Sequence, residues 1–164
     1  MYLNSRGESD INSEPIEKDF AEWMQFGKKE LVVTETAFVS FGEKATEYSY
    51  AMMAKITALV MAHDLDVMIG DTTSTDHYAS IGGFENLETI LPPDVLALVQ
   101  DRLYYAKDEN GKEYACAIDL SGTEFAEVSN LSQDTPLLGL VAGSQRTDHS
   151  VALIRYIFDP SVTK

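Results

Sequence analysis

The stretch YYAKDENGKEYACAIDL, residues 104–120, decides the fold class because it predicts a β-hairpin. The Asn-Gly pair at positions 110–111 stands between two strand-like runs, and this dipeptide favours the tight turn that joins antiparallel strands. In the second run Tyr114, Cys116 and Ile118 alternate with other residues and therefore share one face of a strand. We expect Cys116 to be a core thiol, and an antiparallel sheet to form the centre of the fold.

The strongest helical pattern precedes this hairpin and covers residues 43–63, EKATEYSYAMMAKITALVMAH. Two apolar stripes follow it at helical spacing. The first stripe consists of Ala45, Tyr48, Met52, Ile56, Leu59 and His63, and the second of Ala51, Ala54, Ala58 and Ala62. A helix that is apolar along two stripes is expected to be buried on more than one side.

Weaker patterns fill the rest of the sequence. Helices are predicted over residues 15–26, 84–90 and 92–101, strands over 31–41, 66–69, 125–128, 137–142 and 151–158, and a polar loop over 71–77. Helices thus cluster early and antiparallel strands late, an order typical of α+β proteins and not of doubly wound α/β sheets. We predict an α+β fold with three to four helices packed on a mostly antiparallel sheet of about five to six strands.

The side chains expected in the core lie on the common faces of the strongest periodic segments. They are Trp23, Met52, Ile56, Leu59, Ile118, Ile154 and Phe158.

Residues 1–14 are polar and acidic and predict an extended arm, followed by a single α+β domain over residues 15–164. A segment of this composition cannot build a core of its own and is ordered only where it is tied down. We therefore expect the arm to lie against another chain or a neighbouring surface.

The charge of the chain restricts its partners. The sequence has 12 Lys+Arg and 27 Asp+Glu, which gives a formal net charge of −15 that is spread over both halves. Such a body repels phosphate backbones and anionic membranes, and its longest basic run is only Lys28-Lys29. We expect neither direct nucleic-acid binding nor membrane binding. The expected partner is a protein, either a basic one or a copy of this chain.

The cysteine count and the apolar segments bear on the compartment. Cys116 is the only cysteine, so the chain can form neither a disulfide framework nor a cysteine-based zinc site. Residues 1–15 lack the apolar core of a secretory signal, and the longest apolar stretch, residues 51–62, is too short and too polar to span a bilayer. We expect a cytoplasmic setting, or a particle assembled in the cytoplasm.

The sharpest motif is the tripeptide Thr-Asp-His, which occurs twice. The candidate catalytic residues are Asp76, His77, Asp148 and His149. A carboxylate beside a histidine can orient it for general acid–base catalysis, and two such pairs could face one phosphate or metal. However, about one or two repeated tripeptides are expected by chance in a chain of this length. We therefore predict that the two histidines are not catalytic partners.

A second candidate cluster is His63, Asp64 and Asp66, with Asp71 and Asp76 nearby in the sequence. Oxygen-rich clusters suit Mg²⁺ or Ca²⁺. The spacing matches no calcium-binding loop, and a histidine at a helix C-terminus is a favourable partner for the helix dipole. We predict no metal here and, because the chain also lacks a glycine-rich dinucleotide or phosphate loop, no cofactor.

These observations favour a function without catalysis. We interpret the chain as an acidic protein–protein interaction or assembly module, such as a structural or accessory component of a larger, for example viral, particle. One alternative is an acidic inhibitor of the immunity or counter-defence type, which blocks a basic nucleic-acid-binding surface by presenting carboxylates in place of phosphates. Another is a small hydrolase that uses His77 and His149.

Overall fold

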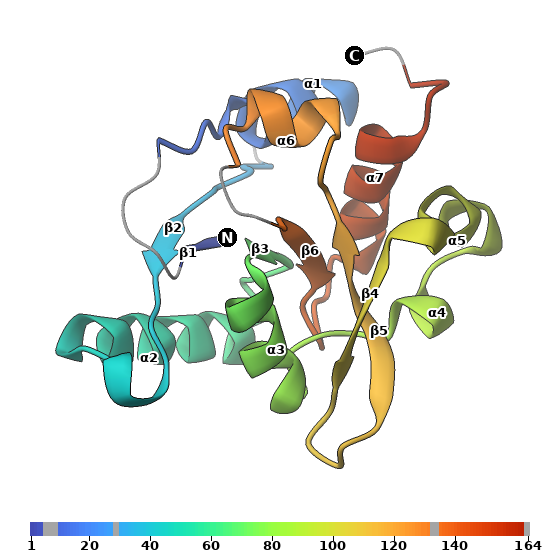
Figure 1. Cartoon of the computed structure of the whole chain (residues 1–164). Helices are drawn as coiled ribbons and strands as arrows, with labels where there is room; N and C mark the ends of the chain where they lie inside the picture. The colour runs from blue at the N-terminus through green and yellow to red at the C-terminus, as the bar shows by residue number, and fades with distance from the viewer. Residues whose placement is uncertain (5–9, 28–29, 132–134, 163–164) are drawn as a thin grey trace.

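The computed structural model describes residues 1–4, 10–27, 30–131 and 135–162 and has an α+β architecture (Figure 1). Its strands are β1 (Tyr2–Asn4), β2 (Thr36–Phe38), β3 (Val67–Gly70), β4 (Leu103–Lys107), β5 (Glu113–Asp119) and β6 (Leu137–Leu140). They form one six-stranded sheet in the order β2-β1-β3-β6-β5-β4. The predicted fold class and strand number are confirmed.

The sheet is mixed. Strand β1 pairs in parallel with both β2 and β3, whereas β3–β6, β6–β5 and β5–β4 are antiparallel pairs. The predicted hairpin is confirmed as β4–β5, and its turn is held by Asp108, whose carboxylate accepts hydrogen bonds from the amides of Asn110 (2.8 Å) and Lys112 (2.9 Å). Gly111 has a φ of 79°, a value that glycine adopts readily.

Helices cover both faces of this sheet. They are η1 (Pro15–Phe20, a π-helical turn), α1 (Ala21–Trp23), η2 (Gly42–Lys44), α2 (Glu47–Met61), α3 (Thr72–Ser80), α4 (Leu87–Ile90), α5 (Pro93–Val99), η3 (Gln100–Arg102), α6 (Glu124–Val128) and α7 (Thr147–Phe158). There are more helices than the sequence predicts, because two predicted strands and one predicted loop are helical.

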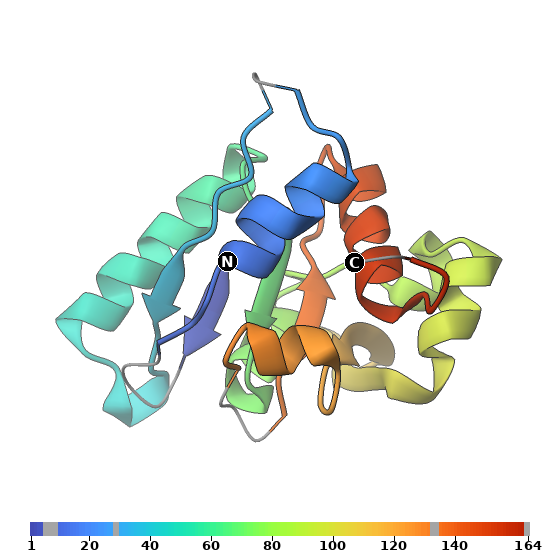
Figure 2. The ribbon, with the colours of Figure 1, turned by 90° about the horizontal axis from the view of Figure 1, so that it is seen from above.

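Neighbouring residues of a strand point to opposite faces of the sheet and therefore belong to two separate cores. Tyr2 and Ile69 join one core and Leu3 and Met68 the other, as the alternation of side chains along a strand requires. The first core lies under η1, α5, α6 and α7, and we call this side of the sheet the α7 face. The second lies under α2 and α3 and is called the α2 face. Seen from above, α2 flanks the β1–β2 end of the sheet (Figure 2).

The predicted N-terminal arm needs correction. Tyr2 and Leu3 are each 1% exposed, and β1 lies between β2 and β3 inside the sheet. Further on, the backbone amide of Asn12 donates to the Ser129 carbonyl (3.0 Å) at the end of α6. Tyr2 and Leu3 are enough to fill a short central strand. The sequence analysis did not recognise this strand because residues 1–14 as a whole are polar and acidic. Residues 5–9 lie outside the described residues.

Two segments that the sequence analysis predicts as a loop and a strand are helices in the structure. In each of them a side chain caps the N-terminus of the helix. Residues 71–77 belong to α3, where the Asp71 carboxylate accepts a hydrogen bond from the Ser74 amide (2.8 Å). Residues 125–128 belong to α6, where the Thr123 hydroxyl accepts one from the Ala126 amide (3.1 Å). Each bond satisfies an amide that the first helical turn leaves unpaired.

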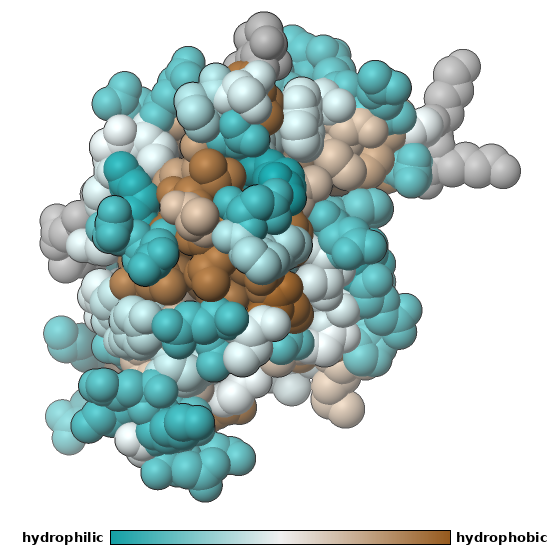
Figure 3. Space-filling model, turned by 90° about the vertical axis from the view of Figure 1, so that its right-hand side faces the viewer, coloured by the Kyte–Doolittle hydropathy of each residue, from teal (hydrophilic) through white to brown (hydrophobic). Residues whose placement is uncertain are grey.

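The predicted strand over residues 151–158 is part of helix α7. The buried residues of α7 include Ser150, Leu153, Ile154 and Ile157, which follow each other at i, i+3, i+4 and i+7. This spacing is helical, although the β-branched composition suggested a strand. Apolar side chains gather in the middle of the face that carries α4, α5 and α7 (Figure 3).

Helix α2 differs from its prediction in bounds and burial. It begins after Thr46, whose hydroxyl accepts a hydrogen bond from the Ser49 amide (3.1 Å), and it buries only Ser49 and Ile56. Of the predicted core, Ile56, Ile118 and Ile154 are fully buried. The side chains that are only half-buried are Trp23, Met52, Leu59 and Phe158. The predicted burial of α2 on more than one side was wrong, since α2 covers only the short strands at one end of the sheet.

Candidate functional site

The two Thr-Asp-His tripeptides lie on opposite faces of the sheet. His77, on α3, stacks on Phe41 with ring centroids 4.1 Å apart, and Phe41 packs against the core of the α2 face. Burial lowers the pKa of His77. His149, in the first turns of α7, packs its ring 5.0 Å from Phe26, which borders the core of the α7 face. The sheet separates the imidazoles, so the hydrolase alternative has no geometric basis.

The carboxylates of the tripeptides also stay apart. Asp76 accepts a hydrogen bond from the Tyr104 hydroxyl (2.9 Å), which ties α3 to the hairpin. Asp148 is exposed in the first turn of α7. A general acid and base must reach the same reacting group, within about 3 Å or through one water, and these side chains have no common group to reach.

The residues of the predicted metal cluster take part in a structural network instead. Asp66 accepts hydrogen bonds from the Ser144 hydroxyl (2.5 Å) and from Nε of Arg146 (2.8 Å). The carbonyl of His63 accepts from Nη2 of Arg146 (2.8 Å), and His63 Nδ1 lies 2.7 Å from the Gly143 carbonyl oxygen. This network fastens the β6–α7 connection to the end of α2 and to β3.

Two further candidate ligands have other positions. Asp64 is exposed and Asp71 caps α3. Over the part of the chain that the structure describes, no group of three or more His, Cys, Asp or Glu side chains is arranged to hold a metal ion.

Cys116 lies in the core of the α2 face and is 0% exposed. Burial raises the pKa of its thiol to about 11. Because the thiolate is the nucleophilic form of cysteine, a thiol with this pKa is inert at neutral pH. The prediction of a core thiol is confirmed.

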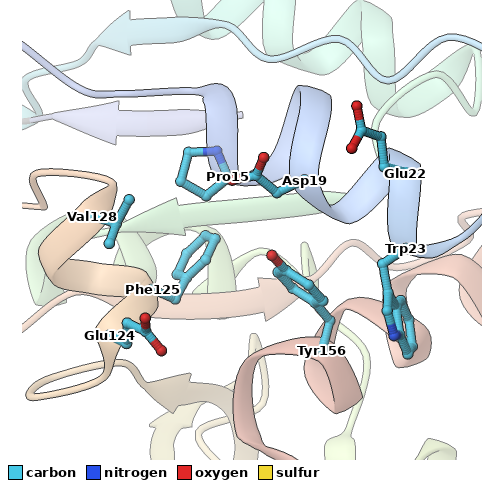
Figure 4. Close-up of a pocket in the computed structure, with 8 residues that line it drawn as sticks. All are labelled: Pro15, Asp19, Glu22, Trp23, Glu124, Phe125, Val128 and Tyr156. Atoms are coloured by element: carbon cyan, nitrogen blue, oxygen red, sulfur yellow. The ribbon is translucent and has the colours of Figure 1, made fainter. Parts of the chain in front are cut away.

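A pocket of about 470 Å³ opens on the α7 face between η1–α1, α6 and α7 (Figure 4). It is lined by Pro15, Asp19, Glu22, Trp23, Glu124, Phe125, Val128 and Tyr156. Tyr156 lies between Phe125 and Trp23 in this view, so aromatic rings from three elements make its walls. We call it the acidic aromatic pocket.

The aromatic walls form a packed cluster. The ring centroids of Trp23 and Tyr156 are 5.6 Å apart, and Phe20 packs against both rings, 6.0 Å from Trp23 and 5.6 Å from Tyr156. Such distances are typical of favourable aromatic pairs. The walls are therefore held in place before any ligand arrives.

Three carboxylates line the pocket together with these rings. Asp19 comes from η1, Glu22 from α1 and Glu124 from α6, so two separate parts of the chain supply them. Burial raises the pKa of Tyr156, and the charges of Asp19 and Glu124 add to the effect. The pocket therefore combines aromatic faces with a negative field. Both features attract organic cations.

A second cavity, of about 510 Å³, lies beneath residues 30–34 and has mainly apolar walls from η1, β3 and α7. The segment above it is fastened by Glu17, which accepts hydrogen bonds from the Thr34 amide (2.8 Å) and hydroxyl (2.6 Å). These bonds lower the pKa of Glu17. This cavity also has charged groups, but its Asp66 is paired with Arg146 (2.8 Å). The lining of the acidic aromatic pocket includes three acids and no basic residue, and we take that pocket as the candidate site.

The sequence analysis missed this pocket. It placed Trp23 in the core and assigned the segments that contain Phe125 and Tyr156 to strands, so the three aromatic walls could not be brought together. One signal was available. Asp19 and Glu22 precede Trp23 within one short helical segment, which places two carboxylates close to an aromatic residue in the sequence.

Comparisons of the chain with protein-family models, with curated proteins and with solved structures find no match. None of the helices in the described ranges is long and apolar enough to cross a membrane. The function is therefore argued from the geometry and charge of the site.

Proposed function

We propose that this protein is a non-catalytic interaction module that binds a basic segment of a partner protein at the acidic aromatic pocket. The observation that carries the proposal is the pocket itself, in which carboxylates from η1, α1 and α6 surround rings of three elements. A concave site with convergent polar groups and aromatic walls is the usual form of a binding site. In an interface, such a pocket receives an anchoring side chain.

The surroundings of the pocket carry the same charge. Residues 14–24 and 124–128 contain six carboxylates and a single lysine, Lys18. The six are Glu14, Glu17, Asp19, Glu22, Glu124 and Glu127, and we call them the acidic surface. All six are exposed, and α1 and α6 line the same pocket. A basic partner would be steered to this surface by long-range attraction, which salt weakens.

The acidic surface also supports the inhibitor as a second candidate. An inhibitor of a nucleic-acid-binding protein needs several carboxylates on one surface. Helices η1, α1 and α6 provide Asp19, Glu22 and Glu124 around one pocket. The two candidates differ in one observable property. For an inhibitor, nucleic acid and this protein compete for the partner, whereas an assembly module binds its partner whether nucleic acid is present or not.

The proposal can be tested with a ten-residue peptide of alternating lysine and arginine. Trp23 is the only tryptophan in the chain and lines the pocket, so its fluorescence reports on this site alone. We expect a saturable change in emission and an affinity that falls as salt is added. The double variant Asp19→Asn, Glu124→Gln should weaken binding several-fold.

The matched control is the double variant Glu47→Gln, Glu109→Gln, which removes the same charge from α2 and from the hairpin turn. It should bind the peptide nearly as well as the unaltered protein. If the peptide does not bind at low salt, or if the control weakens binding as much as the pocket variant does, the proposal fails.

A further inference from the structure

The walls of the acidic aromatic pocket restrict how a cation can lie in it. The rings of Trp23 and Tyr156 meet at 48° with centroids only 5.6 Å apart, so no group fits between them. Tyr156 and Phe125 are only 5% and 3% exposed, so the half-buried ring of Trp23 is the aromatic surface that a cation can contact. A flat group stacks on such a ring better than a compact one does.

The carboxylates stand on two sides of the pocket. Asp19 and Glu22 stand on η1–α1, and Glu124 stands on α6 beside Phe125 (Figure 4). Among the residues that the structure describes, the ion pairs join Lys55 to Glu35, Arg146 to Asp66 and Arg155 to Asp94. The exposed carboxylates of Asp19 and Glu22 are therefore not held by a basic side chain of the described residues.

The two common cationic side chains differ in how well they match this arrangement. A guanidinium is planar, stacks on aromatic rings, is weakly hydrated and spreads its N–H donors in a fork that can reach carboxylates on two sides. An ammonium is a compact, strongly hydrated point charge, and it gives up more hydration when it lies against a ring. The apolar walls from Pro15 and Val128 can cover the methylene stem of an entering side chain.

We infer that the acidic aromatic pocket takes the guanidinium of an arginine in the partner's basic segment and prefers it to a lysine. This inference rests on the proposed function, because it assumes that the pocket is the contact site for that segment. The preference is expected to be less than about fivefold in affinity, because a whole exposed cation–aromatic contact contributes about two- to fivefold and a lysine forms one as well.

The test compares two peptides of equal charge, one with four arginines and one with four lysines, each alternating with glycine. Calorimetry should show that the arginine peptide binds the unaltered protein more tightly. Trp23→Leu keeps an apolar side chain but removes the aromatic ring, and it should bring the two affinities together. The control Tyr48→Leu removes an exposed ring from α2 and should leave the preference unchanged.

The outcomes separate this inference from the proposed function. Equal binding of both peptides, each weakened by Asp19→Asn with Glu124→Gln, overturns the arginine preference while the proposed function stands. Absence of binding by either peptide overturns the proposed function itself. A preference that survives in a folded Trp23→Leu variant places the selection outside the pocket and overturns the inference.

The unaltered protein gives an independent readout if Trp23→Leu fails to fold. The arginine peptide should change the emission of Trp23 saturably, with the same affinity that calorimetry gives. If calorimetry detects binding of the arginine peptide and the emission of Trp23 stays constant, the pocket is not the site and the inference is overturned.

Discussion

Helices α2 and α7 are both rich in apolar residues, yet they relate to the sheet in different ways. Helix α7 has 12 residues and buries five of them, whereas α2 has 15 residues and buries two. On α2 the side chains of Tyr48, Tyr50 and Met61 are 56%, 59% and 77% exposed. The longer helix is therefore the less firmly docked of the two.

The difference shows that the arrangement of apolar residues, and the surface available to receive them, decide burial. The apolar residues of α7 fall on one side at helical spacing, over the core of the α7 face and against α5. Those of α2 are distributed around the helix, and the strands next to it, β1 and β2, are three residues long each. Apolar content alone overestimates how much of such a helix is covered.

The largest effect is expected from Ile154→Asp. Ile154 is 0% exposed on α7, and an unpaired charge there costs several kcal/mol, on the order of the whole stability of a domain. The variant should not fold, as circular dichroism and a thermal melt would show. Ile154→Val, which should cost only about 0.5–1.5 kcal/mol, is the control for the site itself. A cooperative melt of Ile154→Asp near the original temperature would remove α7 from the core.

A smaller and more local effect is expected from Ile56→Asp. Ile56 is also 0% exposed, but it is the only large side chain that α2 buries fully. Hydrogen exchange should show that α2 loses protection while the amides of β5 and β6 keep theirs. Cys116 should remain resistant to alkylation, because it lies on β5, which helix α3 contacts.

The control for this helix is Tyr48→Gln, which should change the free energy of unfolding by less than about 0.5 kcal/mol because the ring is exposed. Global unfolding of Ile56→Asp would contradict the comparison, since it would mean that α2 and the sheet form one cooperative unit.

The smallest effect concerns the ion pair between α7 and α5. Arg155 donates a hydrogen bond to Asp94, and this bond holds the pKa of Asp94 below its usual value. The stabilisation is complete above the ordinary pKa of aspartate and is lost as the pH falls through the lowered value. Arg155→Gln should return the pKa of Asp94 toward its usual value in a carboxyl NMR titration. An unchanged titration would show that the pair does not persist in solution.

The features that sequence reasoning recovered depend on local signals. The Asn-Gly turn of the β4–β5 hairpin and the helical spacing in the first half of the chain were enough for the fold class, although α6 and α7 are late helices. Segments whose structure depends on tertiary contacts were misread. The polar run at residues 71–77 is helical because Asp71 caps it and because Ser74 and Thr75 are buried against the sheet, and neither condition can be seen in the sequence.

The candidate site could not be predicted from the sequence, because the segments that form α6 and α7 were assigned to strands. Asp19, Glu22 and Trp23 could be found together on one helix, but the opposite wall comes from α6 and α7. Both segments have compositions that favour strands, and only the packing of their helical faces against the sheet reveals Phe125 and Tyr156 as walls of one pocket. A pocket between elements far apart in sequence cannot be assembled until those elements are correctly assigned.

The position of β1 between β2 and β3 has a consequence for the kinetics of folding. Tyr2 pairs with Thr36 on one side and with Ile69 on the other, so large loops must close before β1 can join the sheet. The β4–β5 hairpin closes over a few residues. Because the entropy of loop closure is lost before distant contacts compensate for it, local pairings form fastest. We expect the antiparallel half of the sheet to serve as the template on which the parallel half is later assembled.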